Sequence, residues 1–164
     1  MVPSISFESE LAELLPRLRR FAFTLSRSAA DADDLTQATI ERALKSRDQW
    51  QPGTRLDSWA YRIMRNLWID TARARSRRDK VEAPEEEAER VGEDLTASMD
   101  AAVDLSRMMS AMERLPDEQR EVVALILIEG FGYREAAEML DVPIGTVSSR
   151  LVRGRTALLG MVGA

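Results

Sequence analysis

The sequence predicts an all-α protein of two small helical domains joined by an acidic, flexible linker. Apolar residues recur at every third or fourth position over most of the chain, which is the helical period. A stretch rich in acids and poor in large apolar residues divides the chain, and a helix-turn-helix pattern lies near its end. The 164 residues suffice for two small domains, which we place at residues 5–80 and 105–162, with the linker at 81–104.

The composition excludes several classes of protein. Without cysteine or histidine, the chain can form no disulfide, no Cys/His zinc finger and no Ser–His or Cys–His catalytic pair. It has no glycine-rich phosphate loop and no carboxylates at metal-ligand spacing, so we expect no enzyme, no catalytic residue, no metal and no cofactor. The longest apolar run, Val122–Ile128, is far shorter than the roughly 18 residues of a membrane span, and no signal pattern precedes it. We therefore expect no membrane insertion and a cytoplasmic location.

Three helices are predicted in the first block. One covers Glu10–Leu25, where Pro16 sets a start or a kink. The next covers Asp31–Leu44, with acids crowded at its start, where the helix dipole favours them. After a break at residues 51–54, a third begins near Leu56. The apolar stripe of the second helix is Leu35, Ile40, Ala43 and Leu44, and that of the third is Leu56, Trp59, Ala60, Ile63 and Leu67.

The third helix is strongly basic and carries aromatic residues among its arginines. Residues 55–80 hold eight Lys and Arg against three acids, with Trp59, Tyr61 and Trp68 interleaved. Arginines bind phosphate, and aromatic rings stack on unpaired bases, so this combination favours single-stranded or melted DNA. The alternative is a core that contains the tryptophans beneath a solvated basic face, which helical spacing alone would explain. For the cluster Arg73, Arg75, Arg77 and Arg78 we favour nucleic acid.

The charge distribution separates the blocks more sharply than the total of −5 suggests. Residues 1–80 carry +4, residues 81–104 carry −8, and the remainder carries −1. Like charges as dense as those of the middle segment repel one another, and the segment has little to bury, which indicates a solvated spacer. The alternative is an acidic strand that imitates nucleic acid and lies in a basic channel.

The second block begins with a helix whose apolar positions are Leu105, Met108, Met109, Met112 and Leu115, and we expect these methionines to fill the core. Pro116 starts another helix, with acids in its first turn. That helix carries the run Val122–Ile128, apolar nearly all round, which predicts the centre of the domain. Gly130 ends it.

The most informative stretch is a helix-turn-helix pattern. A short helix at 133–140, a tight turn at 141–143 and a longer helix from Ile144 share apolar residues at the spacing that packs two helices around a turn. From Ile144 onward there are three arginines and no acid, which a packing motif alone would not need. Short hydroxyl side chains at Thr146, Ser148 and Ser149 can approach phosphates or base edges near the helix N-terminus. We therefore predict DNA binding by this second helix.

Four motifs in this order resemble a bacterial RNA polymerase sigma factor of the extracytoplasmic-function class, group IV of the sigma-70 family. They are Asp33–Gln37, Trp59–Asp70, Leu115–Arg120 and Val142–Leu151. Each is weak alone, but the combination is specific, and the resemblance covers about residues 11–159. The stretch 14–67 also resembles the subgroup that runs alphaproteobacterial general stress responses. The resemblance implies an alternative sigma factor with a region 2 bundle at 5–80 and a region 4 helix-turn-helix at 105–162, which initiates transcription of a stress or signal regulon.

The resemblance also implies partners and residue roles. Core RNA polymerase would be bound through the β′ clamp helices and the β flap, and the linker would thread toward its active-site cleft. The residues that would bind core polymerase are Asp34, Leu35, Gln37 and Glu41. Those that would open and hold the −10 promoter element are Arg55, Trp59, Arg62, Asn66, Asp70 and Arg73. Those that would bind the −35 element in the major groove are Thr146, Ser148, Ser149, Arg150, Val152, Arg153 and Arg155.

Two positions depart from the family pattern. Ala38 stands where relatives often have a carboxylate, so one polymerase contact is expected to be missing. Ser148 stands where many have Arg or Lys, and a bidentate arginine–guanine contact contributes ~1–3 kcal/mol of discrimination. Readout of the −35 element is then expected to rest on DNA shape or on Arg153.

Two other functions remain open. A stand-alone helix-turn-helix repressor would explain the last 60 residues but leaves the basic aromatic helix and the linker unused. A sigma mimic that sequesters an anti-sigma factor should have lost basic residues from both DNA faces, whereas this chain keeps Arg62, Arg65, Arg73, Arg150, Arg153 and Arg155. Because the family is usually held by an anti-sigma factor, we expect one as an inhibitory partner.

Overall fold

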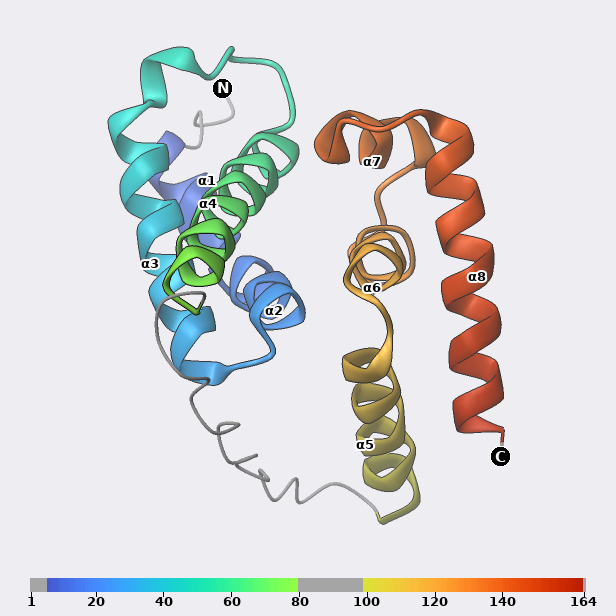
Figure 1. Cartoon of the computed structure of the whole chain (residues 1–164). Coiled ribbons are helices and arrows are strands. Elements are labelled where there is room, and N and C mark those ends of the chain that lie inside the picture. The colour runs from blue at the N-terminus through green and yellow to red at the C-terminus, as the bar shows by residue number, and fades with distance from the viewer. Residues whose placement is uncertain (1–5, 80–98, 164) are drawn as a thin grey trace.

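A computed structural model describes residues 6–79 and 99–163, and every regular element in these ranges is a helix (Figure 1). The N-terminal group consists of α1 (Phe7–Glu13), α2 (Leu15–Ser26), α3 (Ala29–Lys45) and α4 (Leu56–Asp79). The C-terminal group consists of α5 (Met99–Arg114), α6 (Asp117–Val123), α7 (Tyr133–Leu140) and α8 (Ile144–Val162). The predicted fold class is confirmed. Helix α5 begins inside the segment predicted as linker, and residues 80–98 lie outside the described residues.

In the N-terminal group, Pro16 begins a helix and does not kink one. It stands in the first turn of α2, and the chain breaks at Leu14 between α1 and α2. Side-chain oxygens of Ser6 and Ser28 cap the starts of α1 and α3, accepting hydrogen bonds from the Ser9 and Asp31 amides at 3.1 and 3.3 Å. The core of the group includes Leu18, Phe21, Ala22, Ala32, Leu35, Ala60 and Met64.

Two predictions about this group were wrong in detail. Leu44, assigned to the apolar stripe of α3, is 41% exposed, because Ala43 faces the core at that turn and the next residue along a helix points in a different direction. Tyr61, grouped with the aromatic residues that could stack on bases, is buried and packs against Phe21, with ring centroids 4.9 Å apart. Its ring is therefore part of the core.

Directly after α6, the chain of the C-terminal group changes from an α-helix to a π-helix. The segment η2 (Ala124–Ile128) is a π-helix, in which the Glu129 amide donates to the Ala124 carbonyl five residues back, at 2.8 Å. The extra residue rotates the chain, so Val122–Leu125 are buried whereas Leu127 and Ile128 are exposed. The prediction that the whole apolar run is central was therefore wrong for its end. Gly130, with φ +78°, turns the chain as expected.

Helix α5 departs from its predicted core role. Met112 and Leu115 are buried, but Leu105, Met108 and Met109 are 41–50% exposed. The helix contacts α8 over part of its surface, which leaves the predicted stripe only partly covered. The expectation that these methionines fill the core was wrong for both Met108 and Met109.

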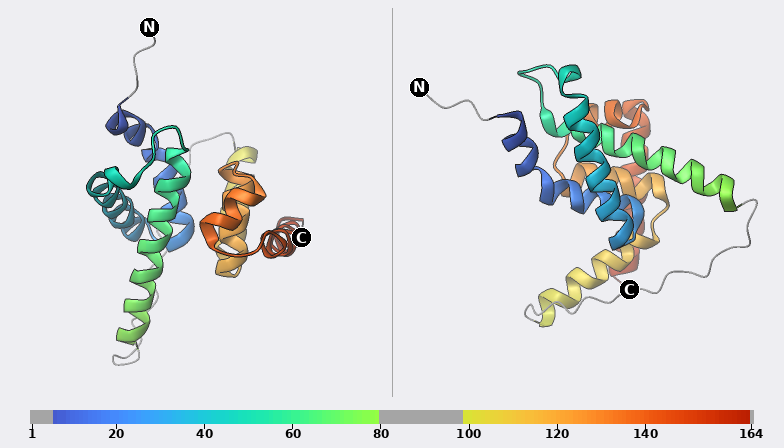
Figure 2. Two further views of the ribbon diagram at one scale, coloured as in Figure 1. Left: turned by 90° about the horizontal axis from the view of Figure 1, so that it is seen from above. Right: turned by 90° about the vertical axis from the view of Figure 1, so that its left-hand side faces the viewer.

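The two groups pack against each other, which nothing in the sequence indicated. Helix α2 lies beside α6 and α4 beside α7, while α8 lies on the far side of α6 (Figures 1 and 2). The last turns of α4 project beyond the C-terminal group (Figure 2). No helix in the described part of the chain is long and apolar enough to span a membrane.

Candidate nucleic-acid interface

The helix-turn-helix has the predicted geometry. Asp141 adopts the left-handed conformation, with φ 54°, and ends α7, while the Val142 amide donates to the Ala137 carbonyl at 3.1 Å. Pro143 then caps α8 in an extended conformation. The residues that pack the two helices together are Ala137, Leu140, Val147 and Leu151, all buried.

The position of α8 is set by close packing on α6. Gly154 is buried, and a Cβ atom at this position would lie 2.8 Å from Cγ2 of Val123 and 3.3 Å from Cβ of Gln119. Only glycine permits this approach. The opposite side of α8 is left at the surface, since α8 lies on the outer side of α6 (Figure 1).

The predicted −35 residues divide between full and partial exposure. Ser149, Val152, Arg153 and Arg155 are exposed, and Thr146, Ser148 and Arg150 are half-buried. Arg150 forms an ion pair with Glu118 of α6 at 3.5 Å. Side chains of α6 and α8 line an open pocket of about 390 Å³ between Pro116 and Arg153. Cationic and hydroxyl groups therefore meet at the first turns of α8, where backbone amides also attract phosphate.

On α4, four of the predicted −10 residues are exposed on one side. Arg62, Asn66, Asp70 and Arg73 follow one another at steps of four, four and three residues, which places them along one face of a helix. Trp59 is half-buried and meets Phe7 edge to face, with centroids 6.1 Å apart. The hydrogen-bonding groups of this face can reach a nucleic-acid strand without unfolding of α4.

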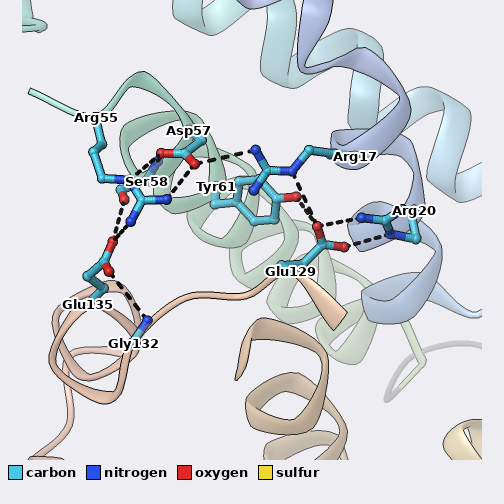
Figure 3. A network of polar contacts seen from close by, with 9 residues as sticks. All are labelled: Arg17, Arg20, Arg55, Asp57, Ser58, Tyr61, Glu129, Gly132 and Glu135. Carbon is cyan, nitrogen blue, oxygen red and sulfur yellow. Dashed lines mark hydrogen bonds and ion pairs between the residues drawn. The ribbon is translucent and has the colours of Figure 1, made fainter. Parts of the chain in front are cut away.

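Arg55, the remaining −10 residue, is engaged in the structure. It donates two hydrogen bonds to Asp57, at 2.8 and 3.1 Å, and one to Glu135 of α7 (Figure 3). Its guanidinium also lies 5.1 Å from the centre of the Phe131 ring. The hydrogen bonds to Asp57 raise the pKa of Arg55. Burial opposes ionisation of Asp57, but the hydrogen bonds from Arg55 and the Ser58 amide outweigh it and lower the pKa of this carboxyl group.

The residues predicted to bind polymerase lie on α3. Asp34, Gln37 and Glu41 are exposed and separated by three and four residues, so they share one face. Leu35 is only 5% exposed and belongs to the core. Three of the four residues therefore form a surface, and the fourth holds the helix in place.

A buried carboxylate between the two groups was missed at the sequence level. The Glu129 side chain is 1% exposed and accepts two hydrogen bonds of 2.8 Å from Arg20 and one of 2.7 Å from the Tyr61 hydroxyl (Figure 3). Arg17 lies 3.6 Å away. Burial, and then the contact with Glu129, raises the pKa of Tyr61, so its hydroxyl keeps its proton. The only sequence signal was an acid directly after an apolar run and before a glycine.

Comparison with known proteins shows which family the chain is related to. The family model Sigma-70 region 2 matches residues 11–78, and Sigma-70 region 4 matches residues 105–158. The sigma factor EcfG of Rhodopseudomonas palustris is 34% identical over 157 residues, covering 96% of this chain and 85% of that protein. The chain belongs to the sigma-70 family. It is an alternative sigma factor of the extracytoplasmic-function class.

Two further relatives agree with this assignment of the sigma factor. SigE of Mycolicibacterium smegmatis is 35% identical over 162 residues, and the match covers 93% of this chain and 60% of that protein. The solved structure of RpoE from Bartonella quintana, in complex with the anti-sigma factor NepR, superimposes with a TM-score of 0.85 at 32% identity. That match covers 96% of this chain and 97% of RpoE. The expected family is confirmed from both sequence and fold.

Proposed function

We propose that this sigma factor binds core RNA polymerase through α3 and promoter DNA through α4 and α8. The observation that carries the proposal is a pair of polar faces, on α4 and on α8, that engage little else in the described part of the chain. Each lies on a helix whose apolar side is buried in a separate group. Two such faces in one molecule fit a promoter with two separate elements, and α3 supplies a third, acidic surface. We infer no reaction of its own for the chain, which acts in the cytoplasm, where bacterial polymerase and promoters are found.

The acidic face of α3 fits the polymerase. Asp34, Gln37 and Glu41 would contact the clamp helices of the β′ subunit, and buried Leu35 would act through the position of α3. Half-buried Ala38 offers this surface no carboxylate. The β flap would bind the C-terminal group.

The exposed face of α4 fits a melted strand. Arg62 and Arg73 would bind phosphates, while Asn66 and Asp70 can bond to the edges of an unpaired base. Trp59 lies at the margin of this face and presents part of its ring. Arg55 would join once it leaves Glu135.

The outer face of α8 fits the major groove of the −35 element. Among the −35 residues, Arg153 is exposed and long enough for a bidentate contact with guanine, whereas Ser148 is short and half-buried. Arg150 and Arg155 would bind the flanking phosphates, with Thr146 and Ser149 near the helix N-terminus and Val152 facing a thymine methyl group.

An anti-sigma factor is the proposed inhibitory partner, and the structure of RpoE in complex with the anti-sigma factor NepR from Bartonella quintana supports it. Exposed Leu105, Met108 and Met109 on α5 provide an apolar surface for it. Similarity to EcfG and to RpoE supports membership of the subgroup that controls the general stress response.

Run-off transcription with purified core polymerase on a promoter library tests the proposal. We expect initiation at promoters that share a two-part motif, and we expect Arg153→Ala to relax the sequence preference at one −35 position. Arg107→Ala, an equal change at an exposed position on α5, is the matched control and should leave the preference intact. No initiation, together with no comigration with core polymerase in gel filtration, would refute the proposal and favour the mimic or the repressor.

A further inference from the structure

The surface between the two groups is built around a charge that neither group could bury alone. Glu129 belongs to the C-terminal group, yet the side chains that neutralise it, Arg17, Arg20 and Tyr61, all come from α2 and α4 (Figure 3). A carboxylate with a 1% exposed side chain would be costly to bury without these partners. We call this set of four residues the Glu129 latch.

Other contacts across the same surface are also polar and directional. Arg65 of α4 pairs with Glu121 of α6 at 2.5 Å, and Ser58 lies 3.5 Å from Glu135 of α7. Arg120 donates to the Thr24 carbonyl at 2.8 Å. Charged groups on both sides can return to water when the groups part, so these polar contacts do not prevent the groups from separating.

The apolar residue Phe131 packs against the Glu129 latch. Phe131 is buried, with its ring 5.1 Å from that of Tyr61 and 5.7 Å from the guanidinium of Arg17. Since Phe131 follows Glu129 and Gly130, the turn after η2 presents both the carboxylate and the ring to the N-terminal group. The π-helix η2 therefore positions the two residues through which the C-terminal group contacts the N-terminal group.

This closed arrangement conflicts with simultaneous recognition of both promoter elements. The −10 and −35 elements are centred roughly 25 base pairs apart, or about 85 Å of B-form DNA. Helix α8 packs on α7, and α7 packs on α4, so about two helix diameters, or ~20 Å, separate the two DNA-binding helices. Residues 80–98 could span at most ~65 Å when fully extended, which is far more than the ~20 Å of the closed arrangement, so the covalent chain permits the groups to move apart.

We propose that the free sigma factor is autoinhibited in this closed arrangement and that the Glu129 latch holds it closed. The proposal rests on the function proposed above, since it concerns the same DNA-binding helices. Closure also holds Arg55, a proposed −10 residue, against Glu135. It leaves the outer face of α8 uncovered, so the −35 element alone can still bind (Figure 1). Polymerase and a two-part promoter then have to separate the groups before initiation.

The test measures opening and activity in the same variants of the full chain. Glu129→Gln keeps the size of the side chain but removes its charge. Glu138→Gln makes the same change at an exposed position on α7 and is the matched control. Arg20→Ala removes a partner of Glu129 from the N-terminal group. Because the Arg20 side chain is half-exposed, this variant should fold even if Glu129→Gln does not.

Opening is measured by spin-label distances between A12C and G160C, both exposed sites in a chain that has no other cysteine. We expect one short, narrow distance in the otherwise unaltered chain and in Glu138→Gln, and a broad, longer distribution in both latch variants. Hydrogen bonds to a charged group predict that the closed-to-open ratio falls ~10–100-fold. Apparent affinity for core polymerase should rise by up to the same factor, with unchanged affinity for an isolated −35 duplex.

The possible outcomes test the role of the Glu129 latch and the proposed function separately. Unchanged spin-label distances in both latch variants would refute the claim that the Glu129 latch holds the groups together. Open distances without a gain in polymerase affinity or in initiation at limiting protein would overturn autoinhibition. If no variant supports transcription, the proposed function fails, while the spin-label distances still decide whether Glu129 holds the groups together.

Discussion

The close packing of α8 on α6 makes a quantitative prediction about two glycines of one helix. Gly154 is buried against α6, whereas Gly160 is exposed, with no heavy atom within 4 Å of a Cβ atom built on it. Alanine at either position gains about 1 kcal/mol of helix propensity over glycine. Only at Gly154 does the new methyl group collide with a neighbour.

The magnitude follows from the distances at Gly154. A Cβ atom there would lie 2.8 Å from Val123 Cγ2, 3.3 Å from Gln119 Cβ and 3.4 Å from the Gln119 carbonyl oxygen. Overpacking of this kind costs ~1–3 kcal/mol, so after the gain in propensity Gly154→Ala should lower the free energy of unfolding by about 1 kcal/mol. Gly160→Ala should raise it by about 1 kcal/mol.

Urea unfolding followed by circular dichroism measures both values in the full chain. We also expect Gly154→Ala to weaken binding of a −35 duplex, because α8 must shift to relieve the contact, and Gly160→Ala to leave it unchanged. Equal stabilisation by the two substitutions would refute the reasoning, since α8 would then not approach α6 as closely as the structure has it.

Three further predictions concern the ion pairs and the DNA-binding face. Tyr61→Phe removes the 2.7 Å hydrogen bond to Glu129 but keeps the ring, so spin-label distances between the two groups should lengthen at an unchanged melting temperature of the N-terminal group. The hydrogen bond from Arg75 lowers the pKa of Asp31, so this pair stabilises the fold above the unfolded-state pKa of ~3.9 and ceases to do so as pH falls through the lower folded value. Stability of Asp31→Asn measured against pH should therefore fall less steeply than that of the unaltered chain below about pH 4. Arg155→Ala should reduce the slope of log affinity against log salt by about 0.9 on every promoter sequence, which a titration at several salt concentrations measures.

Local spacing predicted much of the candidate site. Arg62, Asn66, Asp70 and Arg73 share an exposed face of α4 because their steps match the helical period, which the sequence shows directly. The turn at Asp141 was predicted for the same reason, since a few adjacent residues determine it. Leu35 was placed on the polymerase surface by resemblance alone, whereas its spacing had already put it in the apolar stripe of α3, which packs against α2 and α4.

The sequence by itself determined which segments are helical, where most of them break and which family they belong to, because backbone periodicity, capping and turn chemistry act over a few residues. Only the tertiary structure decided that the two groups close on each other around Glu129. Arg20, Tyr61 and Glu129 are up to 109 positions apart in the chain, so no local pattern links them. The π-helix η2 turns Leu127 outward and Glu129 inward. This choice likewise depends on the helices that pack around η2, since a run of apolar residues has no preferred face of its own.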